Sequence, residues 1–202
     1  MILKIAILDY GVGNLYSLKS AIEKMNITPN IVDNVPNSSQ VDILILPGVG
    51  SFTPACDHLS SLKHDIFNLI NKGVRIFGIC LGLQLFFEKS EEGPGDGLGI
   101  FKGKIVRLPS NMTVPHMGWN NLHKVNNSYL LDGIDDGSWL YFVHSYYPLP
   151  DNDDIIVAET TYGDTFPIIV SNDEVSGTQF HPEKSGKTGL QILNNFITSC
   201  RR

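Results

Sequence analysis

The chain has 202 residues, of which 42% are hydrophobic and 18% are charged, and its formal net charge at pH 7 is −6. This size and balance favour one well-buried globular domain over residues 1–202. The acidic charge argues against nucleic acid or an anionic membrane as partner, and no stretch reaches the ~18 apolar residues of a membrane span. The three cysteines are too widely spaced for a disulfide framework or a metal site, so we expect free thiols, no metal and a cytoplasmic protein.

Strand and helix patterns alternate through the first 88 residues. Apolar runs bounded by turn residues predict strands at 3–8, 30–32 and 43–46. Helical spacing of apolar residues predicts a helix at 15–25, capped by Asn14, and another at 54–72 that ends at Gly73. Such alternation predicts an α/β fold with a mostly parallel central sheet flanked by helices. Sites in this class lie at the carboxyl ends of the strands.

The second half of the chain predicts strands without helices between them. They are expected at 103–108, 114–123, 138–147, 155–161, 166–171 and 174–180. We expect these strands to form an antiparallel extension of the sheet. A last helix is predicted at 186–200.

The peptide RIFGICLGLQLFFE at 75–88 places Cys80 between an apolar strand and a helical pattern. Gly78 and Gly82 stand two residues before and after it, which is the spacing of a nucleophile elbow with Cys in place of Ser. At so sharp a turn the two glycines pass close together, and a Cβ at either would clash. The thiol then lies at a helix N-terminus, which favours its thiolate. A buried structural cysteine is the alternative, and Cys80 alone leaves both open.

The peptide TQFHPE at 178–183 offers a base for this nucleophile. Pro182 biases His181 toward an extended conformation, so that residues 181 and 183 point to the same side. Glu183 can then accept from one imidazole nitrogen while the other faces Cys80. A surface His-Pro-Glu turn is the alternative. Because Cys80 and His181 both lie at carboxyl ends of predicted strands, we interpret the three residues as nucleophile, base and orienting acid.

Acyl transfer also needs hydrogen-bond donors for an oxyanion. The first is the backbone N–H of Leu81, the residue after the nucleophile. The second must come from a neighbouring strand end, and the loop PGVG at 47–50 has the glycines that let N–H groups point inward. An ordinary tight turn is the alternative for this loop.

These motifs resemble the class I glutamine amidotransferases, whose glutaminase domain carries a G-x-C-x-G elbow and a late H-P-E. The narrower resemblance is to the glutaminase subunits of imidazole glycerol phosphate synthase. It rests on peptides spread over nearly the whole chain, namely YGVGN at 10–14, PGVG at 47–50, GICLGLQ at 78–84, PHMGWN at 115–120, YFVHSY at 141–146 and QFHPEKS at 179–185. PHMGWN and YGVGN point to this branch, whereas the elbow and H-P-E identify only the superfamily.

The resemblance implies a flavodoxin-like three-layer fold, L-glutamine as substrate and no cofactor. It makes Cys80, His181 and Glu183 the catalytic triad, with the N–H groups of Val49 and Leu81 as the oxyanion hole. The implied glutamine contacts are Gly48, Gln84, Glu92, Ser145 and Tyr146. Plainer interpretations stay open for two of these contacts, since Gln84 can be a polar residue of a first helical turn and Glu92 a solvated loop acid.

The resemblance also implies a partner, because ammonia released into water would be protonated and wasted. In this family the partner is a (β/α)8-barrel cyclase, joined as a heterodimer, that uses the ammonia to make imidazole glycerol phosphate and AICAR in histidine biosynthesis. Our predicted docking residues are Asn14, His116, Met117, Trp119, Tyr141 and Lys184, since Trp, Tyr and Met are enriched at interfaces. Ordinary sheet packing is their alternative role. We further expect the oxyanion N–H of loop 48–50 to point away until the partner and its ligand are bound.

Other functions remain to be weighed against this one. A cysteine peptidase or esterase on a related α/β scaffold would use the same Cys-His pair on ester or peptide substrates. The glutaminase subunit of pyridoxal phosphate synthase shares the superfamily motifs, although PHMGWN argues against it. A catalytically inactive interaction subunit would require a broken triad, whereas all three residue types are present.

Overall fold

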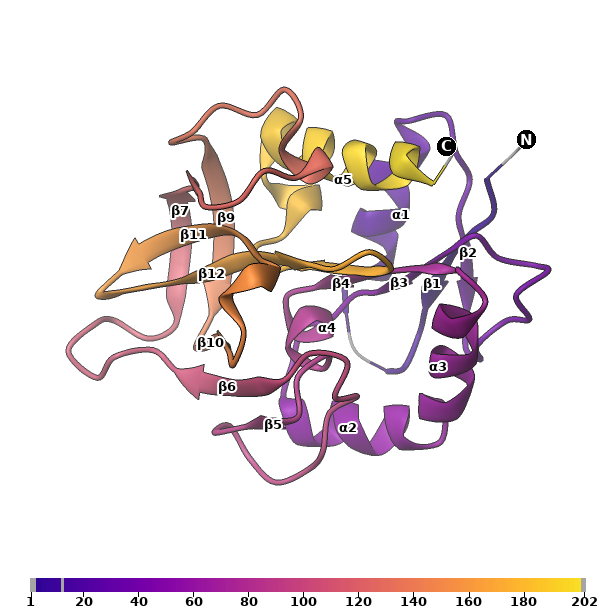
Figure 1. Cartoon of the computed structure of the whole chain (residues 1–202), viewed down its shortest axis with the longest axis horizontal. Helices are drawn as coiled ribbons and strands as arrows, with labels where there is room; N and C mark the ends of the chain where they lie inside the picture. The colour runs from indigo at the N-terminus through magenta and orange to yellow at the C-terminus, as the bar shows by residue number, and fades with distance from the viewer. Residues whose placement is uncertain (1–2, 12, 201–202) are drawn as a thin grey trace.

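An eight-stranded sheet forms the centre of the computed structural model, which describes residues 3–11 and 13–200 (Figure 1). Its strands, in spatial order, are β2 (Asn30–Val32), β1 (Ile5–Leu8), β3 (Ile43–Leu46), β4 (Arg75–Ile79), β13 (Val175–Thr178), β12 (Asp164–Ser171), β11 (Ile156–Tyr162) and β8 (His123–Lys124). The first five are parallel, and the last three continue the sheet antiparallel. Every residue of β1 and β3 is buried, as expected for strands covered on both faces. The predicted mixed sheet is confirmed.

Helices cover both faces of this sheet and complete three layers. One face carries α1 (Leu15–Glu23) and α5 (Gly186–Ser199), and the other carries α2 (Phe52–Ser60) and α3 (Lys63–Asn71) (Figure 1). Successive side chains along each strand point to opposite faces, so the core consists of two clusters, one on each face of the sheet. Ile45 packs in the cluster that holds Leu18 and Phe196, while its neighbour Leu44 packs with Leu59 and Ile66. Within the described ranges, no helix combines the length and the apolar character needed to cross a membrane.

Two helix predictions need correction, while two of the predicted helix ends are confirmed. The single helix at 54–72 is instead α2 and α3, interrupted at Ser61 and Leu62. The helix after the elbow, α4 (Leu81–Gln84), is only one turn long. Asn14 caps α1 as predicted, its side chain accepting from the Ser17 N–H at 3.3 Å. Gly73 follows α3 with a φ of +78°, a conformation that favours glycine at a helix end.

Four of the later strands do not extend the main sheet. β6 (Gly103–Arg107) and β10 (Tyr146–Pro150) form a three-stranded sheet with β5 (Lys89–Ser90), and β7 (His116–Asn121) pairs antiparallel with β9 (Trp139–His144). Three short 3₁₀ helices lie in the connections of this half of the chain, η1 (Tyr129–Leu131) before β9, η2 (Asp153–Ile155) after β10 and η3 (Pro182–Lys184) before α5. The strand predicted at 174–180 was expected in the antiparallel extension, but it forms β13, which lies parallel to β4 inside the sheet. Strand pairing joins distant segments, so local alternation does not specify it.

Candidate active site

Cys80 occupies the sharp turn between β4 and α4. Its φ of 54° and ψ of −107° are strained for a residue with a Cβ, a condition that concentrates at functional sites. The predicted close approach of the two glycines is confirmed, because a Cβ on Gly78 would lie 2.7 Å from the Gly82 carbonyl carbon. A Cβ on Gly82 would overlap the Leu46 carbonyl oxygen of β3. Backbone packing therefore holds the thiol at the carboxyl end of the sheet.

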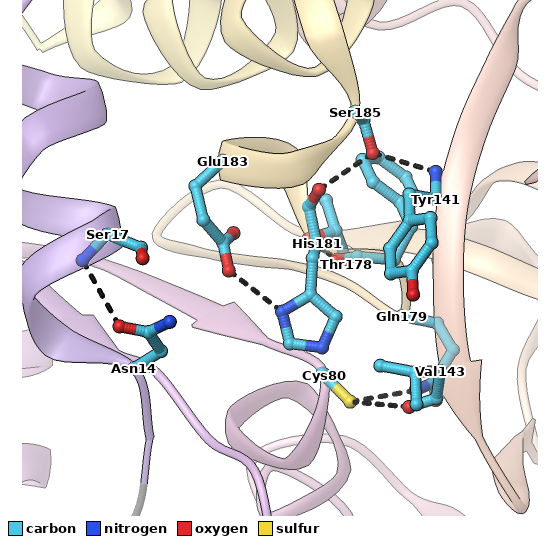
Figure 2. Close-up of polar contacts among 11 residues, drawn as sticks. Asn14, Ser17, Cys80, Tyr141, Val143, Thr178, Gln179, His181, Glu183 and Ser185 are labelled. Atoms are coloured by element: carbon cyan, nitrogen blue, oxygen red, sulfur yellow. Dashed lines mark hydrogen bonds and ion pairs between the residues drawn. The ribbon is translucent and has the colours of Figure 1, made fainter. Parts of the chain in front are cut away.

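His181 reaches Cys80 because their strands are neighbours. The register pairs Thr178 of β13 with Ile79 of β4, and the Cys80 N–H donates to the Thr178 carbonyl at 2.7 Å. His181 Nδ1 lies 2.9 Å from Glu183 Oε1, with both side chains almost fully buried. Figure 2 shows the imidazole between the Glu183 carboxylate and the Cys80 sulfur. The structure thus brings together the three residues predicted as the triad.

The local conformation differs in part from the prediction. His181 is extended, with φ −95° and ψ 100°, but residues 182–184 form η3 and do not continue the strand. The His181 main chain is held by β9, since its N–H donates to the Tyr141 carbonyl at 3.1 Å. The Ser185 hydroxyl donates to the His181 carbonyl at 2.7 Å and accepts from the Tyr141 N–H at 2.9 Å (Figure 2). Hydrogen bonds from the His181 N–H and the Ser185 hydroxyl, on either side of η3, therefore position His181 against β9.

The surroundings of His181 favour its charged form. Burial lowers the pKa of His181, but the adjacent Cys80 sulfur and the Glu183 carboxylate outweigh burial and raise the pKa to about 10. Nε2 faces the sulfur without a hydrogen bond to any described residue, and the second Glu183 oxygen is likewise unpaired there. An imidazolium beside a thiol is the arrangement that generates a nucleophilic thiolate.

We expect His181 to stay protonated well above the ordinary histidine range. Its folded pKa of about 10 exceeds the unpaired value of 6.5, so protonation stabilises the fold fully below about pH 6.5. That stabilisation is lost as the pH rises through about 10. ¹⁵N chemical shifts of the His181 ring, followed from pH 5 to 11, measure this titration. A wild-type midpoint near 6.5 would contradict the assignment, and Glu183→Gln should move the midpoint downward.

A cavity of about 250 Å³ opens directly onto the Cys80 thiol. Of the predicted glutamine and oxyanion residues, it is lined by Val49, Leu81, Gln84, Glu92, Ser145 and Tyr146. Gly48 does not line it, but a Cβ there would lie 2.6 Å from the Leu81 Cβ, so the loop packs on the elbow. A larger cavity of about 670 Å³ beside α3 and β6 is lined by no cysteine or histidine.

The two predicted oxyanion donors do not converge in this structure. The Leu81 N–H points at the Gly48 carbonyl, 3.4 Å away. In a trans peptide the C=O and the following N–H point in opposite directions, so the Val49 N–H is directed away from the Leu81 N–H. The loop therefore presents an acceptor where the oxyanion needs a donor. This geometry agrees with the expectation that the loop donor points away in the free chain.

Four of the predicted docking residues lie in the β7–β9 sheet, on two different faces. Met117, Trp119 and Tyr141 lie on its outward face, where Trp119 is 52% exposed. Trp139 shares this face by register and was missed by the sequence analysis. His116 is a correction, because alternation along β7 turns it inward and leaves it 4% exposed.

Asn14 and Lys184, the other two predicted docking residues, are exposed outside this sheet. Asn14 is also the N-cap of α1, and Lys184 ends η3 immediately after the predicted orienting acid. Neither observation by itself tests a role in docking.

Sequence reasoning also missed three buried polar residues at this site. The Tyr10 hydroxyl donates to the Pro47 carbonyl and so anchors the 47–50 loop. Gln179 donates to the Cys80 sulfur, and His144 lines the cavity. Each lies in a peptide that contributed to the family resemblance, and a polar residue inside an otherwise apolar strand end is the signal that could have found Gln179 and His144.

Comparison with known proteins agrees with this geometry. Residues 6–200 match the model of the family "Glutamine amidotransferase class-I". The chain is 45% identical over 194 residues to the imidazole glycerol phosphate synthase subunit HisH of Methanocaldococcus jannaschii, covering 96% of this chain and 98% of that protein. It is 44% identical over 202 residues to the same subunit of Geobacillus thermodenitrificans, covering 96% and 94%.

Solved structures with the same fold are more distant in sequence. A protein from Thermoplasma acidophilum, described as a GMP synthase subunit, superimposes with a TM-score of 0.74 at 21% identity, covering 100% of this chain and 95% of that one. PurLQS from Thermotoga maritima gives a TM-score of 0.77 at 19% identity, covering 98% and 99%. From the family match and the HisH relatives together, the chain belongs to the class I glutamine amidotransferases, in the branch of the imidazole glycerol phosphate synthase HisH subunits.

Proposed function

We propose that Cys80, His181 and Glu183 hydrolyse L-glutamine to L-glutamate and ammonia, and that the ammonia passes to a cyclase subunit. The observation that carries this proposal is Cys80 in a strained elbow, beside an imidazole whose other nitrogen is 2.9 Å from a buried carboxylate. A glutamine amidotransferase needs a nucleophile, a proton carrier and a cavity that fits one amino acid. The 250 Å³ cavity at Cys80 supports that substrate size.

The first half of the reaction forms a thioester. The Cys80 thiolate attacks the side-chain amide carbon of glutamine, and the carbonyl electrons move to oxygen. When the tetrahedral intermediate collapses, the C–N bond breaks and the His181 imidazolium gives its proton to the departing nitrogen, which leaves as ammonia. The glutamyl group stays on sulfur.

The second half returns the enzyme to its starting state. His181, now neutral, takes a proton from water while the hydroxide attacks the thioester carbon. The C–S bond breaks, glutamate leaves, and Cys80 is again a thiolate beside an imidazolium. Throughout both halves Glu183 holds Nδ1–H, so that Nε2 keeps facing the reaction.

The predicted substrate residues would place glutamine by complementary hydrogen bonds. Gln84 uses its Nε2 on the Gln179 oxygen at 3.0 Å and the Tyr146 carbonyl at 2.9 Å, so its own oxygen is left to accept from substrate. One Glu92 oxygen accepts from the Phe52 N–H at 2.8 Å, which also braces the end of the 47–50 loop. The second carboxylate oxygen of Glu92 would meet the substrate ammonium. Gly48, Ser145 and Tyr146 would contribute backbone contacts.

Rotation of the peptide between Gly48 and Val49 would complete the oxyanion hole. It would remove the Gly48 carbonyl from the Leu81 N–H and turn the Val49 N–H inward. We infer that a bound partner and its ligand favour the rotated form, so the free chain would turn glutamine over slowly. Donors aimed at an oxyanion act on the transition state, which makes this peptide an effective point of control.

The partner we propose is a (β/α)8-barrel cyclase that consumes the ammonia and forms imidazole glycerol phosphate and AICAR. Met117, Trp119 and Tyr141, with Trp139 beside them, would dock on it through the outward face of the β7–β9 sheet. Asn14 and Lys184 would extend this contact. The cysteines of the described residues are unpaired, which favours a reducing, cytoplasmic setting.

Ammonia release from glutamine, with and without the barrel partner and its nucleotide, tests both parts of the proposal. We expect slow release by the free chain and about 10²-fold faster release in the ligand-bound complex, the effect of gaining one oxyanion donor. Equal turnover rates would contradict the control by the loop. No ammonia in either state would contradict glutaminase activity, and hydrolysis of ester or peptide substrates instead would favour the peptidase alternative.

A further inference from the structure

Gln179 lies beside the nucleophile for a topological reason. It is the first residue after β13, as Cys80 is the first after β4, and the two strands are paired in register up to Thr178 and Ile79. Its main-chain N–H donates to the Ile168 carbonyl at 2.9 Å, and the residue is fully buried. The position of its side chain is therefore set by the sheet.

The amide of Gln179 links the thiol to Gln84. Nε2 donates to the Cys80 sulfur at 3.6 Å, and Oε1 accepts from Gln84 Nε2 at 3.0 Å (Figure 2 shows the contact with sulfur). The orientation of both amides follows from the next bond, in which Gln84 Nε2 donates to the Tyr146 carbonyl at 2.9 Å. A carbonyl only accepts, so the Gln84 nitrogen must face it. The Gln179 atom that meets this nitrogen must then be oxygen, which leaves the Gln179 N–H for sulfur.

The same carbonyl is fixed from its other side by two histidines. His144 Nδ1 lies 2.9 Å from the Tyr146 oxygen and must be the donor, so His144 Nε2 accepts from His116 Nδ1 at 3.2 Å. Burial lowers the pKa of His144 to about 3 and also lowers that of His116, which keeps both rings neutral. The His116 ring stacks on the Tyr162 ring, with 4.0 Å between the ring centroids. Four hydrogen-bonded groups, Gln84, the Tyr146 carbonyl, His144 and His116, thus fix one direction for the Gln179 amide.

We propose that Gln179 is a positioning residue of the glutaminase site, which donates its side-chain N–H to the Cys80 sulfur and stabilises it as the thiolate. This inference rests on the proposed function, and it adds an N–H donor to a sulfur whose other contacts are His181 and the Val143 carbonyl, 3.9 Å away (Figure 2). An N–H donor aimed at an anion strengthens in a buried site where water is excluded. Because Gln84 also orients Gln179, the residue predicted to bind glutamine is joined directly to the nucleophile.

The other titratable groups around the sulfur come from separate elements. His181 precedes η3, Tyr10 follows β1, His144 ends β9, and Glu92 lines the same cavity. Tyr10 stays neutral because burial, with the nearby Cys80, raises its pKa far above the ordinary range. Gln179 cannot titrate, so replacing it removes a donor to the sulfur without removing any titrating group.

The test measures the rate of Cys80 alkylation by iodoacetamide against pH in the intact chain, read by mass spectrometry of the peptide that contains Cys80. Gln179→Glu keeps the shape and the acceptor for Gln84 but puts a carboxylate oxygen against the sulfur, and Gln179→Met removes the donor without adding charge. We expect alkylation at pH 7 to fall at least about tenfold in both, because the thiolate loses the N–H that stabilises it.

Asn195→Asp is the matched control. Asn195 is another buried amide, which donates to the Leu130 and Asp132 carbonyls between α5 and η1. It should lower stability without changing the alkylation profile. Wild-type alkylation rates in Gln179→Met and Gln179→Glu, or an equal fall in Asn195→Asp, would overturn the proposal. If one Gln179 variant fails to fold, the other decides.

Kinetics separate positioning from substrate binding. In the complex with the barrel partner, Gln179→Glu, which keeps the acceptor for Gln84, should lose kcat at least about tenfold while KM changes less than threefold, the pattern of a group that acts on the nucleophile. A change confined to KM would contradict this role. Absence of glutaminase activity in the wild type would overturn the proposed function, whereas the alkylation profiles would still decide the contact between Gln179 and the sulfur.

Discussion

Replacing Cys80 with alanine is expected to abolish ammonia release from glutamine, in the free chain and in the complex alike. Without sulfur no thioester can form, and removing the nucleophile of a comparable triad costs at least about 10³-fold in kcat. The elbow is shaped by backbone contacts of Gly78 and Gly82, so the variant should remain folded. Ammonia can be followed with a coupled glutamate dehydrogenase assay, and acid quenching of the wild type with glutamine should trap a glutamyl adduct on the peptide containing Cys80.

Cys56→Ala provides the control for this experiment. Cys56 is a buried cysteine of α2 whose pKa is raised to about 11, mainly by burial and further by Asp57, so it is protonated at neutral pH. The variant should keep wild-type glutaminase activity. Activity of Cys80→Ala within tenfold of the wild type would contradict the assignment of the nucleophile.

Replacing Gly82 with alanine should lower the free energy of unfolding by about 3 kcal/mol, although alanine normally favours a helix. The added methyl would overlap the Leu46 carbonyl of β3, which is backbone and cannot rotate away. Either β3 or the elbow must move, and both carry groups of the site. Urea unfolding followed by far-UV circular dichroism measures the loss, and the alkylation rate of Cys80 should fall with it.

Gly133→Ala is a fair comparison for the effect of a methyl group alone. Gly133 has a φ of +72°, and a Cβ there would meet nothing within 4 Å, so its cost is the backbone conformation, about 1 kcal/mol. If Gly82→Ala proves no more destabilising than Gly133→Ala, the elbow is not packed against β3 as described.

Much of the site could be predicted because its residues stand at strand ends that glycine or proline marks in the sequence. Glycines flank Cys80 at fixed spacing, Pro182 separates His181 from Glu183, and parallel strands bring their carboxyl ends to one edge. What could not be predicted is that β13 would lie beside β4. That pairing is non-local, and it is what puts His181 and Gln179 next to the thiol.

The errors also have identifiable physical causes. Leu59, Leu62 and Ile66 keep helical spacing across the break between α2 and α3, so periodicity could not reveal the break. The prediction that His116 lies on the docking face is wrong because PHMGWN places its apolar residues, Met117 and Trp119, on the outward face of β7, while the inner face carries His116 in a stack of rings. A pattern reports exposure only when one face is consistently apolar.

The ladder between β4 and β13 has a mechanical consequence. Two strands bonded in register fix the relative places of the residues that follow them, Cys80 after β4 and Gln179 after β13, and His181 comes two residues later. Control of the reaction would then act beside these two strands, at the peptide after Gly48, whose carbonyl faces the Leu81 N–H. Under the proposed mechanism, the free chain would already hold its nucleophile and base in place, and the turning of that single peptide would complete the site.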